Sequence, residues 1–165
     1  MRKSITDLGE REILALAISL EEEDSRIYRD FVEKLKANHP ATASILQSMY
    51  EEEVAHRARL TDLYQQLYGD HLPFLRRQDV QGFVKRRPMW LDQRLQPKRV
   101  LSQALAMEAE TRRFYQDATR QVASANARQL LIDLAEAEED HQDILVANTK
   151  DQKKSGALFR EGFSK

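Results

Sequence analysis

Apolar residues along this chain recur every three or four positions, the spacing that places side chains on one face of an α-helix. Glycine and proline are scarce, with 5 and 4 residues among 165, so few positions interrupt the pattern. The sequence therefore predicts an all-α protein with helices over about 7–37, 41–68, 97–122 and 125–149.

Each predicted helix has polar residues in the middle of its apolar stripe, where they would face the core. In chain order, the four stripes are Leu14, Ala17, Glu21, Asp24, Tyr28, Phe31 and Leu35; Leu46, Met49, Glu53, His56, Leu60, Leu63 and Leu67; Leu101, Leu105, Glu108, Thr111, Tyr115 and Val122; and Leu131, Leu134, Glu138, His141 and Leu145.

The lengths of the connections predict how the helices are arranged. Only a few residues join the first helix to the second and the third to the fourth, so each pair should form an antiparallel hairpin. Residues 69–96 form a long crossover connection, expected to contain a short amphipathic helix with Phe74, Leu75, Phe83 and Val84. We expect one domain over 1–150, an antiparallel four-helix bundle, followed by a tail or linker over 151–165.

The two hairpins also repeat two sequence motifs. Residues 21–28 and 108–115 share the pattern Glu-x-Glu-x-x-Arg-apolar-Tyr, and residues 53–56 and 138–141 share Glu-x-x-His. The offset between the hairpins is nearly the same for both motifs. A duplicated hairpin predicts a site with pseudo-twofold symmetry.

Glu-x-x-His directs a carboxylate and an imidazole from one helix face toward a common point. A single pair of this kind is more often part of a solvated helix face. Here both pairs interrupt apolar stripes, where an unpaired carboxylate would cost several kcal/mol to desolvate. Together with the glutamates at the same level of the other two helices, they predict a metal site whose ligands are Glu21, Glu53, His56, Glu108, Glu138 and His141.

The composition of the chain and of the predicted ligand set limits which metal ions the site could bind. The four carboxylates carry four negative charges, which two divalent cations would neutralise. The chain has no cysteine, which excludes thiolate zinc sites and iron–sulfur clusters. Oxygen and nitrogen ligands suit iron or manganese, and zinc is a substitute because intrinsic affinity does not select iron. The net charge of -1 gives no overall attraction to nucleic acid or anionic membranes.

These six residues, with each glutamate of the first and third helices seven residues before a tyrosine, resemble the site of the rubrerythrin and ferritin-like superfamily. The helices are most similar to the erythrin-type domain of bacterial membrane-bound ferritins, which precedes a membrane iron-transport domain. The resemblance implies a ferritin-like fold and two iron ions that oxidise Fe(II) with O₂ or H₂O₂, in ferroxidase or peroxidase chemistry. It also implies a role in iron detoxification or export.

Two alternatives to oxidation follow from the same sequence. An iron-sensing or iron-delivery module would bind metal without productive oxidation, and a structural helical adaptor would bind none. Two departures from rubrerythrins bear on the chemistry. Thr111 stands where they commonly have a further glutamate, and the cysteines of a rubredoxin domain are absent. Electrons for peroxide turnover would come from iron itself or from an outside donor.

The sequence gives weaker indications of a role for the residues that surround the metal ligands. Tyr28 and Tyr115 are expected either to hydrogen-bond ligand carboxylates or to pack as ordinary core residues. Asp24 is in phase with Glu21 and is expected to bind the outer nitrogen of a histidine ligand. Thr111 is the remaining candidate for a residue that surrounds the metal ligands. Off the stripes, solvated helix faces are expected to hold Glu22, Glu23, Glu52, Glu110 and Glu139.

The crossover connection combines basic and aromatic residues: Arg76, Arg77, Lys85, Arg86, Arg87, Arg94, Lys98 and Arg99 with Phe74, Phe83 and Trp90. Packing of the apolar residues on the bundle or on a second subunit, with solvated arginines outside, is favoured over membrane contact. We expect no nucleic-acid partner.

Partners and location follow from segment lengths. The length of the connection predicts a homodimer in which the chains can exchange hairpins. The longest apolar run, residues 13–18, is too short for a membrane span and lacks signal-peptide flanks, so a cytoplasmic chain is expected. If a membrane iron-transport domain follows the C-terminus in a longer protein, the chain would be tethered to the inner membrane face.

Overall fold

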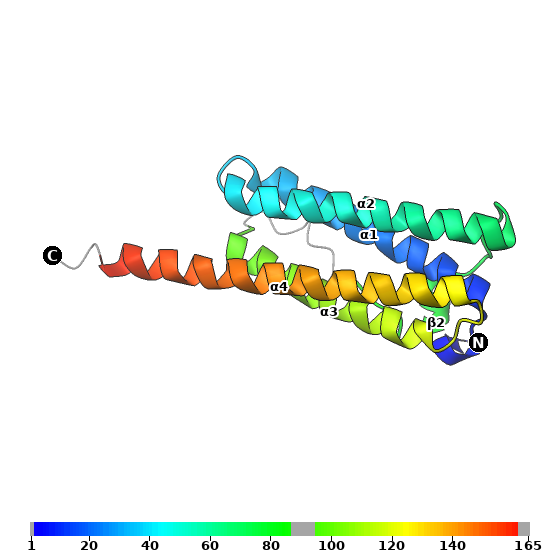
Figure 1. The fold of residues 1–165 in the computed structure, drawn as a ribbon. Coiled ribbons are helices and arrows are strands. Elements are labelled where there is room, and N and C mark those ends of the chain that lie inside the picture. Colours follow the sequence, from blue (N-terminus) through cyan, green and yellow to red (C-terminus); the bar gives the residue numbers. More distant parts are fainter. Residues whose placement is uncertain (1, 87–94, 162–165) are drawn as a thin grey trace.

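The computed structural model describes residues 2–86 and 95–161 of the chain. Within them, four long helices run side by side: α1 Glu10–Leu35, α2 Pro40–Tyr68, α3 Pro97–Thr119 and α4 Ala125–Glu161 (Figure 1). Helix α1 packs against α2 and α3 against α4, which confirms the two predicted hairpins. The hairpins meet through α2 with α4 and α1 with α3, and close a ferritin-like four-helix bundle.

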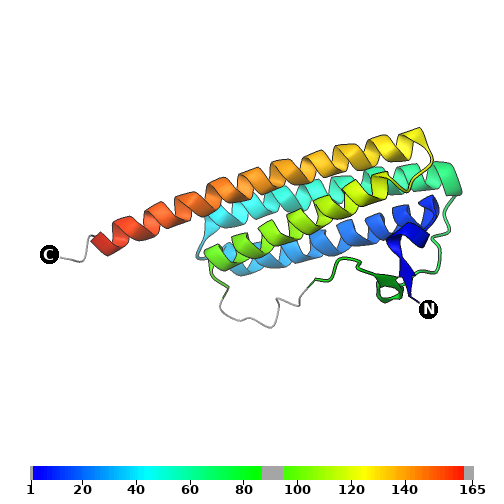
Figure 2. The ribbon, with the colours of Figure 1, turned by 90° about the horizontal axis from the view of Figure 1, so that it is seen from below.

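The helix ends follow local sequence signals. Pro40 and Pro97 occupy the first turns of α2 and α3, where a missing N–H costs nothing. Helix α1 starts at Glu10 rather than at the predicted Asp7 because Ser4 caps a separate 3-10 turn, η1 Ile5–Asp7. Helix α4 continues past its predicted end at Thr149, so residues 151–161 are helical rather than an irregular linker. This extension projects beyond the other helices (Figure 2).

The connection after α2 differs from the prediction. Residues 69–86 contain no amphipathic helix; they form the 3-10 turn η2 Arg77–Asp79 and the short strand β2 Val80–Gln81, which pairs in parallel with β1 Lys3–Ser4. Pro73 and Gly82, whose φ is 72°, disfavour a helix here.

The apolar residues of the connection divide into two kinds. Phe83 is buried and packs edge-on against Phe114 of α3, with ring centroids 5.3 Å apart. Phe74 is instead 93% exposed. Packing on the bundle therefore holds for Phe83 but not for Phe74, while the basic and aromatic residues Arg87, Trp90 and Arg94 lie outside the described residues.

The hydrophobic core is divided along the bundle axis. One cluster contains Leu14, Leu60, Phe114 and Leu131 among others, and a second contains Phe31, Leu46, Leu101 and Leu145 among others. The polar positions of the four stripes lie between the two clusters. Among the described residues, no helix combines the length and apolar character that a membrane span requires.

Candidate metal centre

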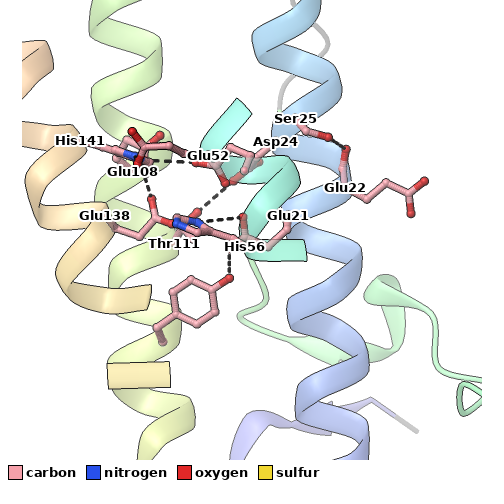
Figure 3. Close-up of polar contacts among 12 residues, drawn as sticks. Glu21, Glu22, Asp24, Ser25, Glu52, His56, Glu108, Thr111, Glu138 and His141 are labelled. Carbon is pink, nitrogen blue, oxygen red and sulfur yellow. Dashed lines mark hydrogen bonds and ion pairs between the residues drawn. The ribbon is translucent and has the colours of Figure 1, made fainter. Parts of the chain in front are cut away.

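The six predicted ligands come together in the polar layer of the bundle. Figure 3 labels Glu21, His56, Glu108, Glu138 and His141 among them. Their ligand atoms form two groups, and the atoms of each group lie within 4.8 Å of one another. The groups are Glu21, Glu53, His56 and Glu138, and Glu53, Glu108, Glu138 and His141. Glu53 and Glu138 belong to both groups, so the two groups of candidate ligands overlap.

Helical geometry explains this convergence. Glu53 and His56 are three residues apart on α2, as are Glu138 and His141 on α4, so each pair points from one face of its helix. Glu21 on α1 and the corresponding glutamate on α3 complete the layer. All six side chains are buried, from 0% exposed for Glu21 to 6% for His56.

The histidine rings lie close to carboxylates of both hairpins. The Nδ1 atom of His56 is 3.6 Å from Glu21 and 3.7 Å from Glu138. The Nδ1 atom of His141 is 3.3 Å from Glu108, 3.5 Å from Glu53 and 3.6 Å from Glu138. The two rings stack with centroids 5.9 Å apart. Each imidazole therefore faces the cluster through the same nitrogen.

Several buried atoms of the cluster have no hydrogen-bond partner within the described part of the chain. They are Oε2 of Glu21, Nδ1 of His56 and both carboxylate oxygens of Glu53 and of Glu138. A buried oxygen without a partner costs about 1–3 kcal/mol, and more when it is charged. A donor set of unpaired oxygens and imidazole nitrogens fits divalent iron or manganese, which would satisfy them directly.

The crowded charges shift several pKa values. Burial, reinforced by neighbouring glutamates, raises the pKa of Glu53 and of Glu138 well above the usual 4.5. Burial alone would lower the pKa of His141, but Glu108 and Glu138 outweigh it and raise the pKa to about 11. Burial opposes ionisation of Glu108, yet its hydrogen-bonding neighbours lower its pKa. The metal-free cluster therefore favours bound protons at several ligands.

Two tyrosines bind ligand carboxylates across the hairpins. The hydroxyl of Tyr28 on α1 donates a hydrogen bond to Glu108 on α3, and the hydroxyl of Tyr115 on α3 donates one to Glu21 on α1. Both tyrosines are fully buried. The two hydrogen bonds follow the pseudo-twofold symmetry of the repeated motif and hold the glutamates of α1 and α3 in place.

Asp24 does not contact a histidine, contrary to the prediction. Its carboxylate accepts hydrogen bonds from Arg86 and from the hydroxyl of Thr111. Burial raises the pKa of Asp24 to about 6, and the Arg86 guanidinium opposes this rise. The expectation of solvated arginines outside the bundle is wrong for Arg86, whose side chain is 3% exposed. No sequence signal separates Arg86 from the other basic residues of the connection.

Glu52 was expected to lie on a solvated face, and its side chain is 53% exposed. Its carboxylate nevertheless lies 2.6 Å from Nε2 of His141, the ring nitrogen that faces away from the cluster. Glu52 thus makes the outer contact that had been assigned to Asp24. Glu110, also expected to be solvated, accepts a hydrogen bond from Arg86.

Two solved structures have the same fold. A hypothetical protein from Pyrococcus furiosus is 24% identical, with 87% of this chain and 90% of that chain covered and a TM-score of 0.68. An uncharacterised conserved protein from Magnetospirillum magnetotacticum is 22% identical, with 86% and 93% covered and a TM-score of 0.71. At these identities the likeness shows the fold alone.

Comparison with known sequences gives the family. No curated protein matches the chain. The model of the rubrerythrin family matches residues 12–148, a span that contains all six residues of the cluster. Because the match covers most of the chain, the chain belongs to the rubrerythrin family.

Proposed function

We propose that the cluster holds two iron ions and that the protein oxidises Fe(II) with O₂ or H₂O₂. The observation that carries this proposal is the pair of overlapping ligand groups that share Glu53 and Glu138. A single metal ion would use only one group and would leave buried, charged ligands of the other unpaired. Four carboxylates together balance two divalent cations.

Each residue has a place in this centre. Glu21 with His56, and Glu108 with His141, would be the terminal ligands of the two positions, and the remaining two glutamates would bridge them. Bound there, two Fe(II) ions would supply two electrons, which with two protons convert H₂O₂ to two waters or O₂ to H₂O₂.

The surrounding residues orient ligands and control protons. The tyrosine hydroxyls fix Glu21 and Glu108 from the opposite hairpin. Glu52 accepts a hydrogen bond from Nε2 of His141, which leaves Nδ1 available to a metal ion. Because Glu52 is half-exposed, it also connects the buried imidazole to solvent protons. The hydrophobic clusters on both sides of the layer limit the access of water.

We propose a cellular role from the resemblance to the erythrin-type domain of membrane-bound ferritins. In that role the chain removes excess Fe(II) by oxidation, or prepares it for export, at the cytoplasmic face of a membrane that holds an iron-transport domain. The homodimer remains a prediction. One chain brings all six residues together, so exchange of hairpins is not needed to complete the cluster.

Anaerobic titration with Fe(II) is expected to saturate at two ions per chain, because the two ligand groups can be filled together. Admission of O₂ or H₂O₂ should then produce ferric absorption in the near ultraviolet, with two electrons lost per pair of irons. A delivery or sensing module would bind two ions without rapid oxidation. Saturation at one ion per chain would contradict the paired centre. If no metal binds in a fixed ratio, the protein would instead be a structural adaptor.

Glu52→Gln is expected to weaken metal binding about 10- to 100-fold, because loss of the outer carboxylate makes His141 a poorer ligand. The repeat places Ala137 at the equivalent position of the other hairpin, so only one of the two metal positions should weaken. Calorimetric titration with Mn(II), which avoids oxidation, should then separate into two steps. Glu51→Gln, a change to an exposed neighbour, is the matched control. If the two variants bind Mn(II) with equal affinity, Glu52 forms only a surface ion pair with His141 and does not tune the metal site.

A further inference from the structure

In the described part of the crossover connection, Arg86 reaches residues of α1 and α3 beside the metal cluster. Its side chain is 3% exposed and lies between α1 and α3. Its guanidinium donates to both oxygens of Asp24, at 2.7 and 2.9 Å, and to the hydroxyl of Thr111 at 2.7 Å. It also donates to Glu110 at 3.0 Å and to the carbonyl of Met107 at 3.4 Å. These contacts join the guanidinium to both α1 and α3.

Asp24 is a fifth buried carboxylate beside the four of the cluster. It follows Glu21 by three residues on the same face of α1 and is 3% exposed. The guanidinium engages both of its oxygens, and the hydroxyl of Thr111 donates to one of them at 3.1 Å. Both oxygens are engaged in this way, and Asp24 belongs to neither group of candidate ligands. Figure 3 shows Asp24 and Thr111 beside the ligand residues.

We propose that Arg86 is a positioning residue that withdraws Asp24 from the metal donor set and balances its charge. The proposal rests on the proposed di-iron function. With Arg86 in place, the Asp24 pair is neutral, and the four cluster carboxylates match two divalent ions. Without it, an ionised Asp24 would add a fifth negative charge to a dry site, where it would favour the trivalent over the divalent state of iron.

Removing the charge of Arg86 or of Asp24 separately tests the proposal, because a purely structural role predicts no opposite shifts in the potential of the iron. Arg86→Met leaves an unpaired carboxylate beside the cluster, so the midpoint potential of the bound iron should shift to more negative values. Asp24→Asn removes the buried negative charge and leaves the guanidinium paired only with the half-exposed Glu110, so the potential should shift to more positive values. Each shift should change the ratio of oxidised to reduced iron about tenfold at a fixed potential, as expected for a unit charge nearby in a protein interior. The double variant should return close to the parent.

Spectroelectrochemical titration of the iron-loaded variants measures these shifts, and thermal unfolding of the metal-free variants gives a second reading. Metal-free Arg86→Met should be less stable than the double variant, because only the single change leaves Asp24 buried and unpaired. Arg77→Met is the matched control: Arg77 belongs to the same connection but binds Ser19 and Glu23. It should leave the potential unchanged.

Opposite shifts for the two single variants, cancelled in the double variant, would establish the charge-balancing role. Shifts of the same sign, or a change in stability without a change in potential, would overturn it and leave Arg86 a packing residue. If the parent protein itself binds no pair of metal ions, the proposed function fails before this test. The two failures are therefore distinguishable.

Discussion

Glu53→Gln or Glu138→Gln is expected to abolish the metal-induced stabilisation and the oxidation of iron, while the metal-free protein stays as stable as the parent or becomes more stable. Both glutamates are 1% exposed, and burial with neighbouring carboxylates raises the pKa of each. Glutamine keeps the shape of the side chain and removes its charge. The metal-free core then loses a repulsion, whereas the metal centre loses a bridging ligand.

Thermal scans with and without Mn(II) measure both effects. A ligand present at about 100 times its dissociation constant stabilises a protein that binds it only when folded by about 2.7 kcal/mol. That difference should be present in the parent and lost in both variants. Glu139→Gln changes the next residue on α4, an exposed glutamate paired with Arg112, and should keep the full shift. Bridging variants that lower metal-free stability and retain the shift would show that these glutamates are structural.

The gap in stability between metal-loaded and metal-free protein is expected to widen as the pH rises above neutrality. In the metal-free protein, the pKa of His141 rises from 6.5 to about 11, so its proton stabilises the folded state fully below pH 6.5. This contribution is lost as the pH rises from 6.5 toward 11. The raised pKa values of Glu53 and Glu138 act in the same direction. Glu108, whose pKa is lowered, acts in the opposite direction, and its stabilisation is lost as the pH falls below 4.5.

Metal-loaded protein should not follow the same pH dependence, since metal ligands bind in their deprotonated forms and higher pH favours binding. Melting temperatures of both forms between about pH 6 and about pH 8.5, under anaerobic conditions with Mn(II), test the prediction. The melting temperature of the metal-free form should fall across this range. A gap that narrows with pH would contradict the protonated metal-free cluster.

The sequence predicts the bundle and its polar layer because both depend on helical periodicity. Glu53 and His56 are aligned with Met49 and Leu60 on one stripe, so their burial follows from the helix that carries them. The tyrosines are predictable for the same reason. The packing of α1 on α2 follows from the short connection between them.

The contacts that could not be predicted from the sequence depend on how distant segments pack against one another. Arg86 lies in an irregular segment, where no periodic pattern indicates which side chain turns inward. Asp24 is predicted to face the core, but its partner comes from that segment rather than from a neighbouring helix. Glu52 is off the stripe of α2, and it reaches His141 only because α4 lies beside α2. Its half-exposed side chain fits a boundary position better than either a core or a solvated one.

The polar layer that divides the hydrophobic core has a consequence for the turnover of the protein. In metal-free protein, the polar layer separates the two apolar clusters, so they do not pack into one continuous core. The two ends are then expected to open separately, as partial unfolding units. Metal ions bound by all four helices would join these ends into one cooperative unit. Because proteases cleave locally opened chains, iron supply would set the lifetime of this protein in the cell as well as its activity.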